Sequence, residues 1–64
     1  MVRINGEEVQ AEGKTVAEFL SENGYNMIRI AVERNGEILP KAKYEETILC
    51  DRDQIEIVSF VGGG

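Results

Sequence analysis

The sequence predicts an α+β fold in which one mixed sheet of four to five strands packs on a single helix. Apolar and polar residues alternate in several short segments, which is the period of a half-buried strand. One segment between them has the apolar spacing of a helix, and two Asn-Gly dipeptides mark tight turns. With 64 residues, the chain has room for one domain and a small core.

The first two strands are expected to form a hairpin. Residues 2–5 alternate between apolar and polar, and Asn5-Gly6 tolerates the positive φ values of a tight turn. Residues 7–11 then return as the second strand. We expect Val9 and Ala11 to face inward on this strand.

A helix of about two turns is expected over residues 16–23. Thr15 and Glu18 match a capping box, in which the Thr15 hydroxyl accepts from the main-chain N–H of Glu18 and the Glu18 side chain reaches back. Gly24 can adopt the left-handed conformation that commonly follows a helix end. The apolar stripe of this helix consists of Val16, Phe19 and Leu20.

The third strand begins a second hairpin. Ile28, Ile30 and Val32 alternate with polar or small residues, and Asn35-Gly36 is the turn that follows them. A short return strand starts at Ile38 and is ended by Pro40, which cannot donate to a sheet.

The last part of the chain returns to the sheet. Residues 41–46 form a polar connection, with Tyr44 as a side chain that covers the core. We expect a short strand over residues 47–50, a turn over residues 51–53 and a final strand over residues 55–60.

This order of elements predicts the ubiquitin-like β-grasp arrangement. A right-handed crossover through the helix joins the first hairpin to the third strand, and the final strand is expected beside the first and parallel to it. Residues 1–60 form the β-grasp domain, and residues 61–64 a flexible glycine tail. The apolar stripe of the helix is expected to pack against Ile4, Ile30, Val32, Ile55 and Ile57.

The charge balance is acidic, with 12 Asp and Glu against 7 Lys and Arg and a net charge of −5. This balance disfavours a nucleic-acid partner and favours a partner with a basic face. The apolar runs are too short to span a bilayer, and a strand pattern starts at once, so we expect no membrane partner and no signal peptide. A single cysteine excludes an internal disulfide, and the expected location is the cytoplasm.

The side chains offer no catalytic constellation. The chain has no histidine, which excludes a Ser-His or Cys-His nucleophile pair, and its lone cysteine excludes a multi-cysteine zinc site. Asp51, Asp53 and Glu56 suggest a divalent-cation site, but two carboxylates that flank Arg52 in a turn are more typical of a solvated loop. We therefore expect no catalytic residue, no metal and no bound cofactor, and hence not an enzyme that works through its side chains.

Cys50 has two interpretations. The first is a small buried residue at a strand end, since free cysteine is among the most buried residue types. The second is a thiol that relays sulfur or forms a mixed disulfide. The negative charges of Asp51 and Asp53 disfavour the thiolate, so we favour the buried, structural role.

The final strand carries apolar residues on both faces. Ile55 and Ile57 satisfy the inward face, whereas Val58 and Phe60 fall on the opposite one. Outward apolar residues are common and need no functional explanation. A patch on a sheet face can also dock a partner, and both interpretations remain open.

The glycines of residues 62–64 are the sharpest feature of the chain. Four other glycines lie where turns or a helix end require them, but no predicted turn or helix end requires Gly62, Gly63 or Gly64. One interpretation is a frayed terminus. Another is a bare end that threads a narrow channel in a partner, with the carboxylate of Gly64 activated as an adenylate and converted to a nucleophilic thiocarboxylate.

Two segments resemble the sulfur carriers of thiamine biosynthesis. They are AVERNGEI at residues 31–38 and DRDQIEIVSFVGGG at residues 51–64. The glycine ending alone is shared by many carriers and modifiers, but its combination with the ERNG hairpin and this length is more specific. Arg52 departs from the pattern, where a glycine between the acids is common, and Ser59 lies in a variable position.

The resemblance implies a carrier cycle that other proteins carry out. An E1-like adenylyltransferase activates Gly64 with ATP, and a cysteine desulfurase or rhodanese-type protein supplies the sulfur. A thiazole synthase then takes that sulfur to build the thiazole moiety of thiamine. Gly64 carries the sulfur, and Gly62 and Gly63 thread the partner's channel. From the sheet faces we add Val58, Phe60 and Val61 as docking residues.

Three alternatives remain open. The small subunit of molybdopterin synthase also ends in Gly-Gly, although its chains are usually longer. A ubiquitin-like covalent modifier would form isopeptide bonds with lysines. The chain could also be a simple interaction domain whose glycine tail has no role.

Overall fold

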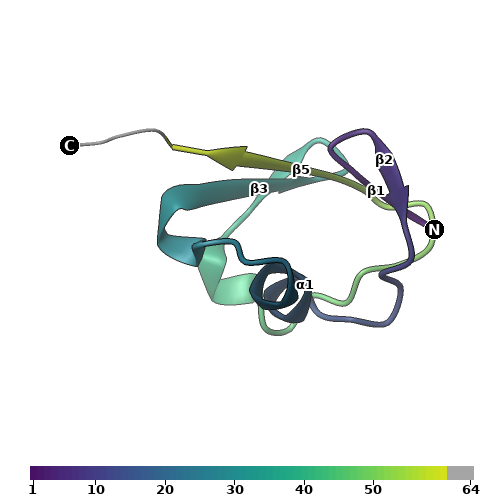
Figure 1. The fold of residues 1–64 in the computed structure, drawn as a ribbon, viewed down its shortest axis with the longest axis horizontal. Coiled ribbons are helices and arrows are strands. Elements are labelled where there is room, and N and C mark those ends of the chain that lie inside the picture. The colour runs from purple at the N-terminus through teal and green to yellow at the C-terminus, as the bar shows by residue number, and fades with distance from the viewer. Residues whose placement is uncertain (61–64) are drawn as a thin grey trace.

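The computed structural model describes residues 1–60, which form a five-stranded sheet and one α-helix (Figure 1). Helix α1 lies under one face of the sheet, and the chain enters and leaves the sheet at opposite ends. The elements are β1 (Val2–Ile4), β2 (Glu7–Val9), α1 (Val16–Glu22), β3 (Ile30–Arg34), β4 (Glu37–Leu39) and β5 (Gln54–Ser59), with 3₁₀ turns at Met27–Arg29 and Lys41–Lys43.

The sheet has the mixed topology that the sequence predicts. Its strand order is β2-β1-β5-β3-β4, with the last strand at the centre. Strand β5 runs parallel to β1, with Ile4 opposite Ile55, and antiparallel to β3, with Val32 opposite Ile57. Each outer strand forms an antiparallel hairpin with its neighbour, β2 with β1 and β4 with β3. The β-grasp prediction is therefore confirmed.

Helix α1 begins with the predicted capping box. The Thr15 hydroxyl accepts from the main-chain N–H of Glu18 at 3.0 Å, and the Glu18 carboxylate accepts from the Thr15 N–H at 2.8 Å. These bonds satisfy two of the donors that a helix start leaves unpaired. The helix ends at Glu22, one residue before the predicted end, with Asn23 as its C-cap. Gly24 follows with φ of 76°.

The core lies between α1 and the sheet. Leu20 and Val32 are completely buried, as is Val2 on the parallel strand pair. The three side chains of the helix stripe and the five expected opposite it are all buried, whereas Val9, which the sequence also places inward, is only partly buried. Tyr44 covers the core as expected, and its side chain is also buried. No helix within residues 1–60 is long and apolar enough to cross a bilayer.

The third strand starts later than its apolar alternation predicts. Ile28 belongs to a 3₁₀ turn, and its side chain is 81% exposed. The cause is local: the Asn26 side chain accepts from the Ile28 N–H at 3.0 Å and caps this turn. The second strand is likewise shorter than predicted and ends at Val9, although Ala11 is buried as expected.

Residues 47–50 do not form the predicted strand. Ile48 makes one isolated bridge with Thr15, and Leu49 exchanges main-chain hydrogen bonds with the loop before α1, donating to Lys14 at 2.8 Å and accepting from Gly13 at 2.9 Å. The prediction was wrong because the main-chain partners of this segment belong to a loop rather than to a strand. The buried Leu49 side chain explains the strand-like pattern.

Replacing Arg52 by glycine should stabilise the fold. Arg52 has φ of 73°, a left-handed conformation that disfavours residues with a Cβ atom, and its side chain is 92% exposed. The free energy gained by relieving this strain exceeds the entropic cost of the more flexible unfolded chain that glycine creates. We therefore expect a gain of about 0.5 kcal/mol in the free energy of unfolding. Urea denaturation measures it. Arg52→Ala keeps the strain and serves as control; equal effects of both substitutions would contradict the explanation.

Candidate functional site

The end of β5 is held in place up to the last described residue. Ser59 lies opposite Ile30 in the ladder, and the Phe60 N–H donates to the carbonyl oxygen of Arg29 at 2.7 Å. The 3₁₀ turn that displaced the predicted start of β3 therefore anchors the point from which residue 61 continues. Val61, Gly62, Gly63 and Gly64 lie outside the described residues, so their predicted roles stay predictions.

Strand β5 presents its apolar residues on both faces, as the sequence indicates. Ile55 and Ile57 are buried on the side of α1. Val58 and Phe60 are 53% and 57% exposed, respectively. Their outward placement is thus confirmed, whereas their role in docking remains a prediction.

The outward face also includes a residue that the sequence analysis missed. Ala31 lies opposite Val58 in the ladder, and Ile38 of β4 lies opposite Glu33. Residues that are directly opposite share one face of a sheet, so Ile38 faces the same side as Val58. Ile38 is 75% exposed. The signal in the sequence was an apolar residue placed three positions after the Asn35 of a tight hairpin.

The turn before β5 is organised around a buried carboxylate. Asp53 is only 6% exposed, so its placement in a solvated loop was wrong. Its oxygens accept from the Cys50 N–H at 2.9 Å, from the Asn35 amide at 3.1 Å and from Arg34 Nε at 3.1 Å. The Asn35 amide oxygen in turn accepts from the Gln54 N–H at 2.8 Å. Asp53 thus ties the β3–β4 hairpin to the start of β5.

The protonation of Asp53 reflects two opposed effects. Burial alone would raise the pKa of its carboxyl group, because the charged form loses hydration. Hydrogen bonds from the Cys50 N–H, Asn35 and Arg34 outweigh burial and lower this pKa below its ordinary value. The carboxylate is therefore ionised at neutral pH and holds its three donors in place.

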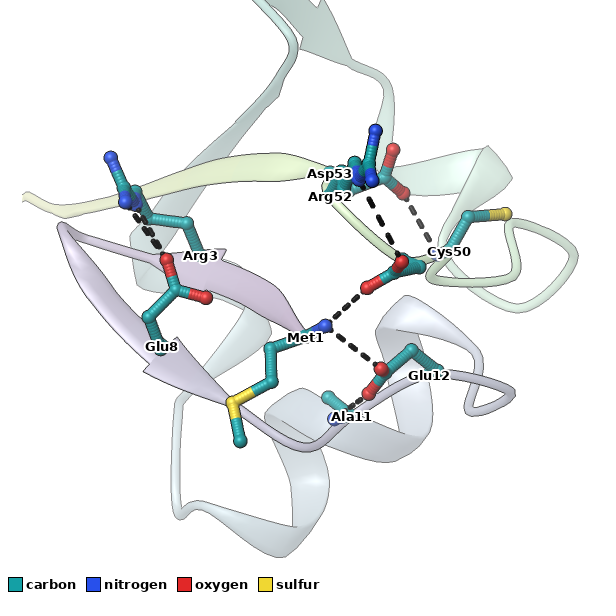
Figure 2. A network of polar contacts seen from close by, with 9 residues as sticks. Met1, Arg3, Glu8, Ala11, Glu12, Cys50, Arg52 and Asp53 are labelled. Carbon is teal, nitrogen blue, oxygen red and sulfur yellow. Dashed lines mark hydrogen bonds and ion pairs between the residues drawn. The ribbon is translucent and has the colours of Figure 1, made fainter.

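A second polar cluster lies at the surface around the amino terminus (Figure 2). The Met1 ammonium contacts the carboxylates of Asp51 and of Glu12, the latter at 3.0 Å. Hydrogen bonds first with Asp51 and then with Glu12 raise the pKa of this ammonium, and the bond with Met1 lowers the pKa of Asp51. Since these groups are exposed, the cluster fastens loops at the surface and adds little stability.

Cys50 is exposed, so the prediction of a buried residue was wrong. Its main-chain N–H donates inward to Asp53, and its thiol lies 3.6 Å from the carbonyl oxygen of Ile48. In Figure 2 its side chain points away from the polar cluster.

The described residues show a hollow at the surface but no group of side chains that could hold a metal ion. Within residues 1–60, no three His, Cys, Asp or Glu side chains are grouped so that they could hold a metal ion. A surface hollow of about 420 Å³ lies beside the amino terminus. It is lined by Met1, Arg3, Glu8, Asp51, Arg52 and Gln54, of which all but Gln54 take part in ion pairs at the surface.

The chain is similar to proteins named as sulfur carriers. The sulfur carrier protein ThiS of Bacillus subtilis is 44% identical over 66 residues that cover the whole of both chains. That of Thermus thermophilus is 38% identical over the whole of both chains. The crystal structure of the thiamine biosynthesis protein (ThiS) from Geobacter metallireducens superimposes with a TM-score of 0.78, at 34% identity over 98% of this chain and 97% of that one.

A second kind of relative is much longer. The thiazole synthase of Paramagnetospirillum magneticum is 47% identical over 62 residues, which are 95% of this chain but 19% of that protein. The chain therefore spans about a fifth of the thiazole synthase that it matches. The family model that describes the ThiS family matches residues 1–64. Together with the full-length relatives and the shared fold, this match establishes that the chain belongs to the ThiS family.

Proposed function

We propose that this protein is a sulfur carrier in the biosynthesis of the thiazole moiety of thiamine, and that the carboxylate of Gly64 is its working group. The observation that carries the proposal is the match of the whole chain to sulfur carriers of the same length. Its side chains fit a carrier, because the chain has no histidine that could act as a base for its exposed thiol. The partners must supply the catalysis.

The reaction sequence uses the terminal carboxylate as an acyl group. An E1-like adenylyltransferase joins a Gly64 carboxylate oxygen to the α-phosphorus of ATP and releases pyrophosphate. Sulfide then displaces AMP and leaves a thiocarboxylate; a persulfide would leave an acyl disulfide that a second thiol reduces. ATP is thus consumed by the partner and is not a cofactor of this chain. The sulfur donor is a cysteine desulfurase or a rhodanese-type protein.

The acceptor of the sulfur is a thiazole synthase. This partner is supported by relatives in which the sequence of this chain is part of a thiazole synthase. Gly62 and Gly63, which lack Cβ atoms, would thread the narrow channel of the partner so that Gly64 reaches the reacting groups. Val58, Phe60 and Val61 would dock the domain beside that channel. We place the cycle in the cytoplasm, where a thiocarboxylate and a free thiol persist.

Reconstitution with purified partners tests this proposal. The chain, ATP, a sulfur source and the E1-like enzyme of the same organism are incubated with thiazole synthase or, in parallel, with molybdopterin synthase large subunit. Sulfur transfer should occur in the incubation with thiazole synthase and not in the one with molybdopterin synthase large subunit. Turnover only with the molybdopterin enzyme would contradict the proposal, as would isopeptide-linked conjugates of this chain as the main product.

Cys50→Ser should leave sulfur transfer unchanged. The proposed cycle places sulfur on Gly64, and the only hydrogen bond of the thiol within residues 1–60 is a long one to the carbonyl oxygen of Ile48. Serine preserves the size of the side chain, so the fold should be equally stable. The reconstituted assay measures the transfer rate. Abolished transfer with a folded variant would show that the thiol takes part.

A further inference from the structure

Strand β4 ends before it has covered the whole of β3. Leu39 is opposite Val32, so a hairpin two residues longer would bring Lys41 opposite Ile30. Pro40 follows Leu39 and has no N–H to donate, and the chain turns away into a 3₁₀ turn that begins at Lys41. The carbonyl oxygen of Ile30 therefore lacks the main-chain partner that a longer β4 would give it.

The side chain of Lys41 supplies the donor that the strand does not. Its Nζ donates to the Ile30 carbonyl oxygen at 2.7 Å and lies 5.9 Å from the centroid of the buried Tyr44 ring. The face of an aromatic ring attracts a cation, so Tyr44 helps to hold the ammonium against β3. No ion pair within residues 1–60 involves Lys41. Its ammonium binds the main chain instead.

The part of β3 that Lys41 holds also anchors the end of β5. Ile30 is opposite Ser59, and the neighbouring carbonyl oxygen of Arg29 accepts from the Phe60 N–H at 2.7 Å. The start of β3 is thus held by β5 on one side and by Lys41 on the other. Without the bond from Lys41 this end of the strand would fray, and the acceptor of the Phe60 N–H would move with it.

We propose that Lys41 is a positioning residue for the reactions of Gly64. Its ammonium fixes the start of β3 and, through it, the position of Phe60, from which the chain continues toward the terminal carboxylate. This inference rests on the proposed function, because it names a residue that prepares the carrier for its activating partner. A fixed Phe60 reduces the conformational entropy that is lost when the partner binds the end of the chain.

NMR relaxation of the isolated protein tests the positioning itself. Lys41→Met removes the ammonium and keeps an apolar side chain of similar length beside Tyr44. The order parameter of the Phe60 N–H should fall from about 0.85, the value of rigid backbone, toward about 0.6. The order parameter of the Ile57 N–H, which donates to the Asn5 side chain at 2.7 Å, should not change. An unchanged value at Phe60, or equal losses at both amides, would overturn the proposal.

Lys43→Met is the matched control. Lys43 lies in the same 3₁₀ turn, but its ammonium pairs with Glu46 at 3.4 Å rather than with β3. This variant removes the same charge and should leave the order parameter of Phe60 unchanged. Lys41→Arg keeps a cationic donor and should restore most of the order that Lys41→Met loses. A loss of order in either variant as large as that in Lys41→Met would overturn the proposal.

The kinetics of adenylation connect the position of Phe60 with the proposed function. Pyrophosphate release by the E1-like enzyme of the same organism is measured against the concentration of each variant. Lys41→Met should raise KM about fivefold at unchanged kcat, because the end of β5 then becomes ordered only on binding. Lys41→Arg should restore KM, and Lys43→Met should leave it unchanged.

The two proposals fail in different ways. An equal rise in KM for Lys41→Met and Lys43→Met would show that only the positive charge matters, and it would overturn the positioning role of Lys41. Adenylation that is absent with the wild-type chain would contradict the proposed function instead. The order parameter of Phe60, which needs no partner, would still decide whether Lys41 positions the end of β5.

Discussion

Deletion of Gly64 should abolish sulfur transfer without unfolding the protein. The deletion withdraws the terminal carboxylate by about 3.5 Å, the length of one residue. Reacting atoms must approach to about 3–3.5 Å, and a displacement of about 1 Å can already lower a rate about 100-fold. The melting temperature should not change, because every core side chain identified lies within residues 1–60. Thiazole formation in the reconstituted system and thermal denaturation measure the two effects.

A semisynthetic chain with a C-terminal amide is the matched control for this deletion. It keeps Gly64 and the length of the tail but has no carboxylate oxygen that can attack ATP. It should be as inactive as the deletion variant. Sulfur transfer by either protein would contradict the role of the terminal carboxylate, whereas loss of folding would indicate that the tail has a structural role.

Asp53→Ala should produce the largest loss of stability among the polar residues. The substitution leaves the Cys50 N–H, the Asn35 amide and the Arg34 guanidinium without their acceptor, and Arg34 is itself two-thirds buried. We expect a loss of about 2–4 kcal/mol in the free energy of unfolding, a large part of the stability of so small a domain. Urea denaturation measures it. Asp51→Ala, which removes an exposed carboxylate, should have little effect. Similar losses of stability in the two variants would contradict the difference between the buried and the exposed carboxylate.

The same carboxylate should make stability depend on pH. The pKa of Asp53 is lower in the folded protein than its ordinary value of 3.8, so the unfolded chain binds its proton more readily. The stability that the ionised Asp53 contributes is therefore complete above its ordinary pKa, and it is lost as the pH falls through the lowered pKa of the folded protein. Asp53→Asn should flatten the acid limb of the stability curve. An unchanged acid limb would show that other carboxylates cause it.

Local signals in the sequence predicted most of the fold. The two Asn-Gly pairs predicted to form hairpin turns have positive φ at both residues, with 50° and 86° at Asn5-Gly6 and 52° and 87° at Asn35-Gly36. The start of α1 could be predicted from the capping box, because its two hydrogen bonds join residues only three positions apart in the sequence. Errors arose where a local alternative competed with apolar alternation. At Ile28 a side-chain cap formed a 3₁₀ turn, and at Leu49 burial was mistaken for a strand.

The candidate site was predictable only in part. The outward placement of Val58 and Phe60 follows from the two-residue period of a single strand. That Ile38 shares their face depends on the register of three strands, two of which are far apart in the sequence. The burial of Asp53 depends on donors from Arg34 and Asn35, which lie on the preceding hairpin. Neither arrangement can be inferred from spacing alone.

Intact-mass spectrometry after incubation with ATP, sulfide and the E1-like enzyme tests the central claim most directly. The mass should increase by the difference between sulfur and oxygen, and fragmentation should place the exchange on Gly64. A protein of unchanged mass would contradict the account. So would a mass increased by a whole sulfur atom on Cys50, because sulfur would then travel as a persulfide on a side chain.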